Sequence, residues 1–238
     1  RQMQLKGWQC TALNDFPKNI ATMSFTGGCN FRCPMCHNAD LVLRPEALPS
    51  IPAAQVMAHL EQRAGMITGV VITGGEPTLQ PDLGDFIAQL KHSNDGLAIK
   101  LDTNGYRPDV LAALLDEGLV DYVAMDVKAP PEKYAQLAGR EPNRFDVTRI
   151  ERSINLIREN QRPYEFRTTV VPSLLTASDI EIIARWLDGA ETYILQQFRA
   201  QGILNPTLAG ITPYATAELA AMAERARRWL PTVKLRGA

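Results

Sequence analysis

The chain has 238 residues, with 25 basic and 26 acidic side chains and a formal net charge of −1 at pH 7. No basic block stands out, so the composition argues against nucleic acid or an anionic membrane surface as a partner. The first residues lack the apolar core of a signal peptide, and no apolar run approaches membrane-spanning length. We therefore expect a cytoplasmic protein, in which clustered cysteines bind a metal or take part in catalysis.

Strand-like apolar runs alternate with helical patterns along the chain. Apolar residues recur at helical spacing between the runs, which predicts amphipathic helices. The predicted strands are residues 20–28, 69–75, 97–105, 121–129, 165–172 and 192–198. The predicted helices are centred on residues 83–90, 110–115, 150–157 and 180–187, and the last and longest covers residues 216–230.

This alternation predicts an α/β protein with a mostly parallel sheet. Six βα units in 238 residues fit an incomplete, open (βα)6 TIM-like barrel better than a closed eight-unit barrel, which usually takes about 250 residues. A doubly wound sheet remains the alternative, because periodicity does not separate the two. We predict one domain over residues 1–238, with an N-terminal flap at 1–19, the βα units at 20–230 and a C-terminal tail at 231–238.

Chemically distinctive residues follow four successive predicted strands. Parallel βα proteins place active sites at the carboxyl ends of their strands, so we expect one site there. Gly, Asp and Asn also end strands as turn formers, which explains any one of these residues but explains the whole set less well. After the cysteines that follow the first strand, the set is Gly74, Gly75, Glu76, Asp102, Thr103, Asn104, Asp126 and Lys128.

Three of the four cysteines lie in "FTGGCNFRCPMCHNAD", residues 25–40, with the spacing Cys-x3-Cys-x2-Cys at Cys29, Cys33 and Cys36. A structural zinc site normally needs four protein ligands. His37 adjoins Cys36 and is poorly placed as the fourth, and Cys10 lies 19 residues before Cys29. A disulfide and simple core packing are further alternatives. Ordinary iron–sulfur clusters have four cysteine ligands, so three thiolates on a four-iron cube would leave one iron open to a small molecule.

The cysteine spacing resembles the signature of the radical S-adenosylmethionine (radical SAM) enzymes. The chain is also similar to the glycyl-radical-enzyme activases, and within these most similar to activating proteins of anaerobic ribonucleoside-triphosphate reductase. The resemblance extends over essentially the whole chain and implies the radical SAM type of the incomplete barrel. It is carried by "CHN" (36–38), "GGEP" (74–77), "DTNG" (102–105), "MDVK" (125–128) and "RTTVVP" (167–172).

The resemblance implies that Cys29, Cys33 and Cys36 hold a 4Fe-4S cluster whose open iron binds the amino and carboxylate groups of S-adenosylmethionine. Reductive cleavage would then give methionine and a 5′-deoxyadenosyl radical, which takes a hydrogen atom from a glycine of a partner enzyme. Reduced flavodoxin or ferredoxin is the expected electron donor. The implied contacts to S-adenosylmethionine are Met35, Asn38, Gly74, Gly75, Glu76, Asp102, Asp126, Lys128 and Arg167.

Asp102 and Asp126 raise an electrostatic question, because two carboxylates facing one site repel each other unless a cation or a proton lies between them. Resemblance to pyruvate formate-lyase activases implies a candidate monovalent cation site. Its ligands would be Asp102, Thr103, Asp126 and the backbone carbonyl of Ala124. Lys128 is the alternative source of positive charge.

The chain departs from the family pattern at two places. Met35 stands where the superfamily often has an aromatic residue, and a thioether fills that space without stacking. The segment "DFPK" (15–18) stands where relatives often read D-Y-P-G, in the flap that we expect to face the partner. Cys10 has no matching role. Three alternatives remain open: an activase of a pyruvate formate-lyase-like enzyme, a radical SAM enzyme for a small molecule, and a passive electron-transfer protein.

Overall fold

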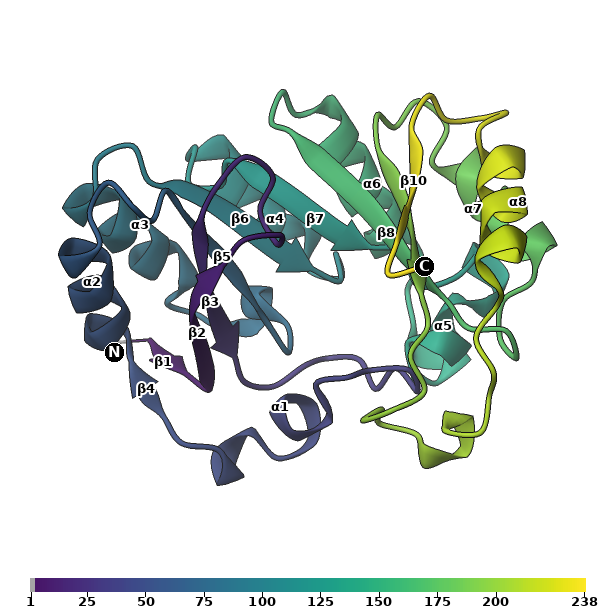
Figure 1. Cartoon of the computed structure of the whole chain (residues 1–238), viewed down its shortest axis with the longest axis horizontal. Helices are drawn as coiled ribbons and strands as arrows, with labels where there is room; N and C mark the ends of the chain where they lie inside the picture. The colour runs from purple at the N-terminus through teal and green to yellow at the C-terminus, as the bar shows by residue number, and fades with distance from the viewer. Residues whose placement is uncertain (1–2) are drawn as a thin grey trace. The chain divides into compact units, whose positions relative to one another are not determined.

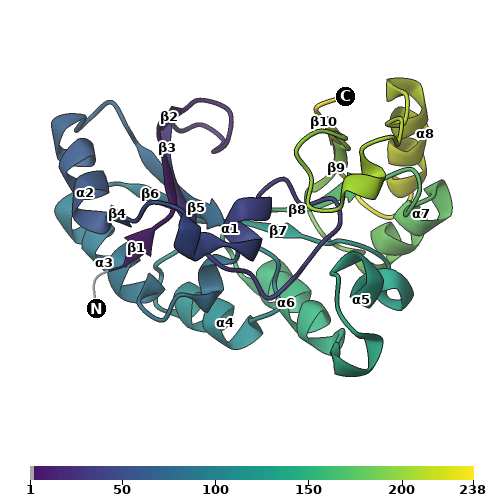
Figure 2. The same ribbon diagram turned by 90° about the horizontal axis from the view of Figure 1, so that it is seen from below.

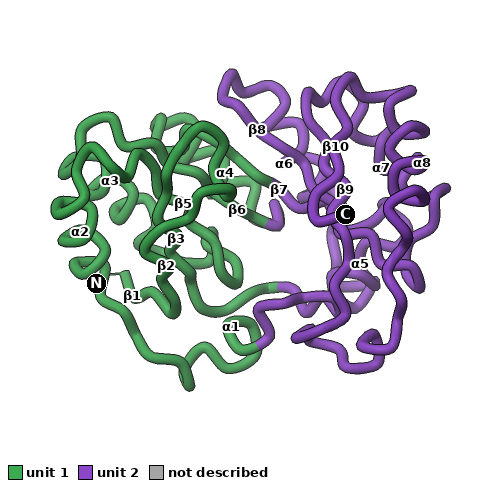
Figure 3. Tube along the Cα trace, in the orientation of Figure 1, with its two compact units in different colours: residues 1–30, 40–103, 107–124 green, residues 31–39, 104–106, 125–238 purple. Residues whose placement is uncertain are grey.

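The computed structural model describes residues 3–238, and the chain divides into two compact units (Figure 3). Unit 1 consists of residues 1–30, 40–103 and 107–124, and unit 2 consists of residues 31–39, 104–106 and 125–238. The described part of the chain contains no helix that is long and apolar enough to span a membrane.

Unit 1 is built on a sheet whose strands are mostly parallel. β3 (Ala21–Thr26) pairs in parallel with β5 (Gly69–Gly74), which pairs in parallel with β6 (Ala98–Thr103). On its other side β3 pairs antiparallel with β2 (Gly7–Ala12). A separate two-stranded ladder joins β1 (Gln4–Leu5) to β4 (Ile51–Pro52). The boundary between the units falls within β7 (Tyr122–Asp126).

The main helices of unit 1 lie along one side of its strands (Figures 1 and 2). Each buries an apolar stripe; in α3 the stripe is made by Leu83, Phe86, Ile87 and Leu90, as the helical spacing predicts. The helices are α2 (Ala53–Gln62), α3 (Leu83–Ser93) and α4 (Pro108–Asp116), with 3-10 turns η1 (Pro45–Ala47) and η2 (Pro77–Leu79). The short α1 (Ala39–Leu43) begins in unit 2.

The amino ends of the unit 1 strands are covered by Phe16. Its ring is buried against Ala21 and Val71 and meets the Tyr122 ring edge-on, at a centroid distance of 5.8 Å. Gly69, the first residue of β5, leaves room for it, because a Cβ there would lie 2.8 Å from the Phe16 ring. The "DFPK" segment therefore lies at the opposite end of β5 from Gly74.

Unit 2 contains a parallel ladder of β8 (Tyr164–Val170), β9 (Tyr193–Gln197) and β10 (Val233–Arg236). Helices α7 (Ala177–Trp186) and α8 (Thr216–Ala226) pack against each other (Figure 1). The other elements are α5 (Tyr134–Leu137), α6 (Thr148–Glu159), η3 (Pro131–Lys133), η4 (Pro142–Arg144) and η5 (Pro206–Leu208).

The predicted α/β class with a mostly parallel sheet is confirmed, and each of the six predicted strands is present, as β3, β5, β6, β7, β8 and β9. Two details of the prediction are wrong. The last helix ends at Ala226 and is shorter than α6. The predicted C-terminal tail contains β10, whose four residues include two cations and so gave little apolar signal.

Candidate functional site

The cysteine loop, residues 28–39, begins in unit 1 with Gly28 and Cys29 and continues in unit 2 with residues 31–39. Cys33 is buried, whereas Cys29 and Cys36 are partly exposed. None of the cysteines in the described residues forms a disulfide. Each part of the loop is held by backbone contacts within its own unit.

In unit 1, the start of the loop is held by the strand end that carries Gly74 and Gly75. The backbone amides of Gly75 and Glu76 donate to the carbonyls of Thr26 and Gly28, at 2.9 and 2.8 Å. A Cβ on Gly75 would lie 2.0 Å from the Gly28 oxygen, and a Cβ on Gly74 would lie 2.3 Å from the Thr26 nitrogen. Both glycines thus make room for the chain itself, in addition to the role that the sequence predicts for them beside a ligand.

In unit 2, the loop is held from two sides. The Arg32 amide donates to the Ala138 carbonyl at 2.8 Å, and the Leu204 amide donates to the Cys36 carbonyl at 2.8 Å. Gly139 adopts a positive φ of 62°, and a Cβ there would lie 2.2 Å from the Arg32 oxygen. The sequence analysis missed Gly139, although a glycine just after a short helix is a recognisable C-terminal signal.

An aromatic cluster packs behind the loop in unit 2. Phe31 is buried, with ring centroids 5.4 Å from Tyr106 and 5.9 Å from Phe145. The Phe145 ring stacks on Tyr106 at 5.0 Å and on Tyr134 at 5.5 Å, each with an interplanar angle of 16°. Because Phe31 lies between Cys29 and Cys33 in sequence, burial of its ring fixes the path of the loop.

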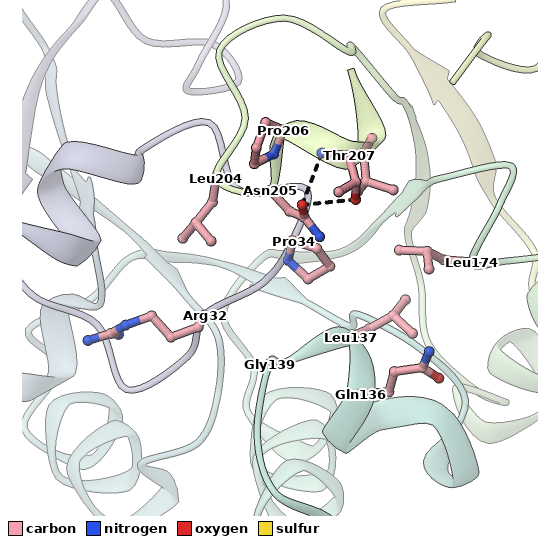
Figure 4. Close-up of a pocket in the computed structure, with 11 residues that line it drawn as sticks. Arg32, Pro34, Gln136, Leu137, Gly139, Leu174, Leu204, Asn205, Pro206 and Thr207 are labelled. Carbon is pink, nitrogen blue, oxygen red and sulfur yellow. Dashed lines mark hydrogen bonds between the residues drawn. The ribbon is translucent and has the colours of Figure 1, made fainter. Parts of the chain in front are cut away.

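A groove of about 590 Å³ in unit 2 is lined partly by loop residues Arg32 and Pro34 (Figure 4). Leu137, Leu174 and Leu204 give it an apolar wall. Asn205 is held on the rim, because its side-chain oxygen accepts from the Thr207 amide and hydroxyl, at 3.0 and 2.9 Å. The remaining lining residues are Gln136, Gly139, Pro206 and Leu208.

Glu76 and Thr103 meet within unit 1, as their positions after neighbouring strands predict. The Glu76 carboxylate is buried, and its Oε1 accepts from the Thr103 hydroxyl at 2.7 Å. The same oxygen accepts from the Thr78 hydroxyl and amide, at 2.6 and 3.2 Å, and so caps η2. Glu76 thus orders the turn after β5.

Asp102 has a cationic partner that the sequence analysis missed. The Lys100 ammonium lies 3.2 Å from its Oδ1, and both residues belong to β6. The available signal was a lysine inside the otherwise apolar run "LAIKL". Side chains two residues apart on a strand point to the same face, so this pair is visible in the sequence once the strand is assigned.

Asp126 lies between two cations in unit 2. Its Oδ2 accepts from the Lys128 ammonium at 2.8 Å, and its Oδ1 accepts from Arg167 Nε at 2.8 Å. Burial raises the pKa of Asp126, but the charges of Arg167 and Lys128 and their hydrogen bonds outweigh it and hold this pKa well below its usual range. Asp126 therefore stays ionised near neutral pH.

Lys128 also interacts electrostatically with two cysteines of the loop. Burial lowers the pKa of Lys128, but the Asp126 carboxylate and the Cys33 and Cys36 sulfurs outweigh it and raise this pKa well above its usual value. The Lys128 ammonium and the sulfurs of Cys33 and Cys36 thus interact electrostatically within unit 2. This is the clearest electrostatic link between the predicted strand-end residues and the cysteines.

Arg167 continues the charge network along unit 2. Besides Asp126, it lies 3.9 Å from Glu165, whose buried carboxylate also binds Arg236 in a bidentate manner, at 3.0 and 3.1 Å. The sequence analysis missed Glu165 and Arg236, because nothing in the sequence indicates that β10 lies within reach of β8. Asp102 and Asp126, the two aspartates that the sequence predicts for the site, each have a cationic partner within their own unit.

The other predicted residues are placed as follows. Met35 is buried, and Asn38 is partly exposed. Ala124 is buried within β7. Cys10 is exposed on β2 and lies level with the amino half of β3, whereas Cys29 follows the carboxyl end of that strand. Within unit 1, this position separates Cys10 from Cys29 along the strand direction.

The model of the Radical SAM superfamily matches residues 23–187, which include all three motif cysteines. The chain belongs to the radical SAM superfamily. It is a radical SAM enzyme, and the family implies a 4Fe-4S cluster and S-adenosylmethionine as its cofactors.

Two relatives of the chain come from Methanocaldococcus jannaschii. One, named a putative glycyl-radical enzyme activating enzyme, is 32% identical over 223 residues, which cover 93% of this chain and 91% of the relative. A second protein of the same description is 29% identical over 167 residues, which cover 68% of this chain and 60% of that relative.

Solved radical SAM structures share the fold. Streptococcus suis SuiB bound to the precursor peptide SuiA matches with a TM-score of 0.65 and 15% identity, over 89% of this chain and 47% of SuiB. Coproporphyrinogen III oxidase from Escherichia coli matches with a TM-score of 0.56 and 17% identity, over 90% of this chain and 53% of that enzyme. The chain spans about half the length of each, and the likeness confirms the predicted TIM-like α/β fold.

The donor set fits the radical SAM cluster. Residues 25–40 contain three cysteines, and two of them, Cys33 and Cys36, interact electrostatically with Lys128. Within residues 3–238, no three His, Cys, Asp or Glu side chains converge around a point suited to one metal ion. A four-iron cluster does not require such convergence, because each thiolate binds an iron of its own.

Proposed function

We propose that this radical SAM enzyme activates a glycyl-radical enzyme by removing a hydrogen atom from a backbone glycine of that partner. One observation carries the proposal: a relative described as a glycyl-radical enzyme activating enzyme aligns over 93% of this chain and 91% of its own length at 32% identity. Near-complete coverage of both chains argues that the two proteins share their whole architecture.

Cys29, Cys33 and Cys36 would hold the 4Fe-4S cluster, with S-adenosylmethionine at the open iron. When bound, the cluster supplies the electron that cleaves S-adenosylmethionine into methionine and the 5′-deoxyadenosyl radical that takes the glycine hydrogen. Lys128 supports this assignment, because its ammonium interacts electrostatically with the sulfurs of Cys33 and Cys36.

The remaining predicted residues would position the substrate. The strand end of Gly74, Gly75 and Glu76 would receive the methionine amino group, in line with its rigid backbone contacts to residues 26 and 28. Further proposed contacts are Met35, Asn38, Asp102, Asp126, Lys128 and Arg167. The candidate monovalent cation site of Asp102, Thr103, Ala124 and Asp126 has weaker support, because both acids already have cationic partners.

We propose anaerobic ribonucleoside-triphosphate reductase as the partner, on the similarity of the "GGEP", "DTNG" and "MDVK" motifs to its activating proteins. Activation of a pyruvate formate-lyase-like enzyme is the alternative, because the same chemistry would act on a different docking partner. Reduced flavodoxin or ferredoxin would supply the electron, in the cytoplasm.

The test uses the full-length protein with its cluster reconstituted without oxygen. Incubation with S-adenosylmethionine, a strong reductant and a candidate partner labelled with deuterated glycine should give a glycyl-radical signal by electron paramagnetic resonance. It should also transfer deuterium into 5′-deoxyadenosine. Cys33→Ser should abolish both signals, and Cys10→Ser should leave both unchanged.

Comparison of a reductase with a pyruvate formate-lyase-like enzyme as the labelled partner decides between the two partner classes. Formation of unlabelled 5′-deoxyadenosine with every glycyl-radical partner would contradict the proposal. A small-molecule substrate would then become the better hypothesis.

A further inference from the structure

Lys100 is a buried lysine in β6. The alternation of a strand places Lys100 and Asp102 on one face and the buried Ile99 and Leu101 on the other. The Lys100 side chain is 3% exposed, and a lysine is almost never fully buried unless it is paired. Its position therefore needs an explanation.

Three groups from three segments surround the Lys100 ammonium. Nζ donates to the backbone carbonyl of Asp15 at 2.5 Å and lies 3.2 Å from Oδ1 of Asp102. The centroid of the Tyr122 ring lies 5.9 Å away, within the range of a cation–π interaction. A carboxylate, a carbonyl and an aromatic face are groups that also attract a small monovalent cation.

A second lysine–aspartate pair of unit 1, Lys91 with Asp121, is a more exposed ion pair and serves as a comparison. The Lys91 ammonium lies 2.8 Å from Oδ2 of Asp121, but their side chains are 27% and 30% exposed. The corresponding values for Lys100 and Asp102 are 3% and 13%. Solvent and salt therefore screen the Lys91–Asp121 pair more than the Lys100–Asp102 pair.

We propose that Lys100 is a positioning residue that serves as a built-in monovalent cation for Asp102. Its ammonium neutralises this carboxylate and fixes its orientation at the carboxyl end of β6, so that no ion from solution is needed there. The link to the Asp15 carbonyl sets the position of the ammonium. The inference rests on the proposed function, because only that function makes Asp102 a contact of S-adenosylmethionine.

The first experiment uses protein without its cluster and tests the ion pair alone. Urea unfolding is measured for Lys100→Met, Asp102→Asn and the double variant. Lys100→Met should lower stability strongly, because it leaves a buried carboxylate without its cation, and adding Asp102→Asn should restore part of the loss. Lys91→Met is the matched control and should have a small effect. Additive losses in the double variant would overturn the proposed pairing.

The second experiment measures binding of S-adenosylmethionine by calorimetry, on protein with its cluster, in choline, sodium and potassium salts. The wild type should bind equally in all three. Lys100→Met should bind about tenfold or more weakly in choline, and sodium or potassium should restore part of the affinity. Lys100→Arg keeps the charge and should remain insensitive to the salt.

Two results would overturn the proposal: a wild type that needs sodium or potassium, or a Lys100→Met variant whose binding is unchanged in every salt. If Lys100→Met fails to fold, the salt dependence of S-adenosylmethionine binding by the wild type still tests whether an ion from solution is needed. A wild type that holds its cluster but never binds S-adenosylmethionine would overturn the proposed function instead. The unfolding cycle would still decide whether Lys100 and Asp102 are paired.

Discussion

Each unit of the protein places a lysine and an aspartate two residues apart, but the two pairs differ in how exposed their side chains are and in which other groups surround them. In unit 1 Lys100 precedes Asp102 within β6, and the lysine is almost completely buried. In unit 2 Lys128 follows Asp126 at the end of β7, where the two side chains are 21% and 31% exposed. The order of the two residues along a strand thus decides which group lies nearer to its carboxyl end.

This difference separates two electrostatic roles. Lys100 has a backbone carbonyl and a ring as further neighbours, so its charge is directed at one carboxylate. Lys128 also interacts electrostatically with Cys33 and Cys36, and Asp126 has Arg167 as a second cation. Both lysines therefore pair with a carboxylate, but only Lys128 also interacts with cysteines.

The largest expected effect concerns the cysteines, which the two units hold in different surroundings. Serine at Cys29 in unit 1 should abolish the cluster as completely as serine at Cys33 or Cys36 in unit 2, because in the proposed cluster each thiolate would bind one iron. Iron and sulfide analysis after anaerobic reconstitution should give about four irons per chain for the wild type and for Cys10→Ser. Loss of the cluster in Cys10→Ser would show that the three-ligand assignment is wrong.

The next effect compares the aromatic side chains of the two units. Phe16→Ala should lower the free energy of unfolding by about 3–5 kcal/mol, because the buried ring covers the amino ends of the unit 1 strands. Phe145→Ala should cost about 2–3 kcal/mol, because this ring is only partly buried between Tyr106 and Tyr134. Urea unfolding of both variants measures the difference, and a larger loss for Phe145→Ala would reverse the comparison.

Glycine substitutions compare a crowded glycine beside the cysteine loop in unit 2 with an uncrowded helical glycine in unit 1. Gly139→Ala should cost about 2 kcal/mol or more, because the positive φ and the Arg32 oxygen leave no room for a Cβ. Gly84→Ala, inside α3 and with only ordinary contacts for its Cβ, should instead stabilise the protein by about 0.5–1 kcal/mol. Thermal unfolding measures both, and equal effects would mean that the contact at Arg32 is easily relieved.

The smallest expected effect on stability concerns Asp179, which caps the start of α7. In unit 2, α7 begins with a capping box in which Asp179 accepts from the Thr176 amide and pairs with Lys133. Burial raises the pKa of Asp179, but these partners outweigh it and lower this pKa below its ordinary value. Asp179→Asn should therefore cost about 1–2 kcal/mol at pH 7.

The pH dependence of this loss has a defined sign. Because the native pKa of Asp179 is depressed, its contribution is fully present above the unfolded pKa of about 3.9 and disappears as the pH falls through the native pKa. The gap between wild type and Asp179→Asn should therefore shrink below about pH 4 in urea unfolding. Asp188→Asn, exposed beyond the carboxyl end of α7, is the control. A gap that stays constant with pH would contradict the assigned ion pair.

Much of the fold followed from the sequence, because the apolar runs and helical stripes are local patterns. The six strands and the helices around 83–90, 110–115, 150–157 and 180–187 are present where the spacing predicts them. β10 and Gly139 were missed for different reasons. β10 is stabilised by its pairing with β9 and has little apolar character of its own, and Gly139 depends on the approach of Arg32 from a distant part of the chain.

By itself, the sequence determined the three thiols and the chemistry of the strand-end residues, because these follow from short spacings along one segment. Only the tertiary structure decided that Arg167 binds Asp126, that Glu165 binds Arg236 and that Gly75 makes room for Gly28. Those contacts join residues that are far apart in the chain. Their energies depend on burial and distance, which residue spacing alone does not set.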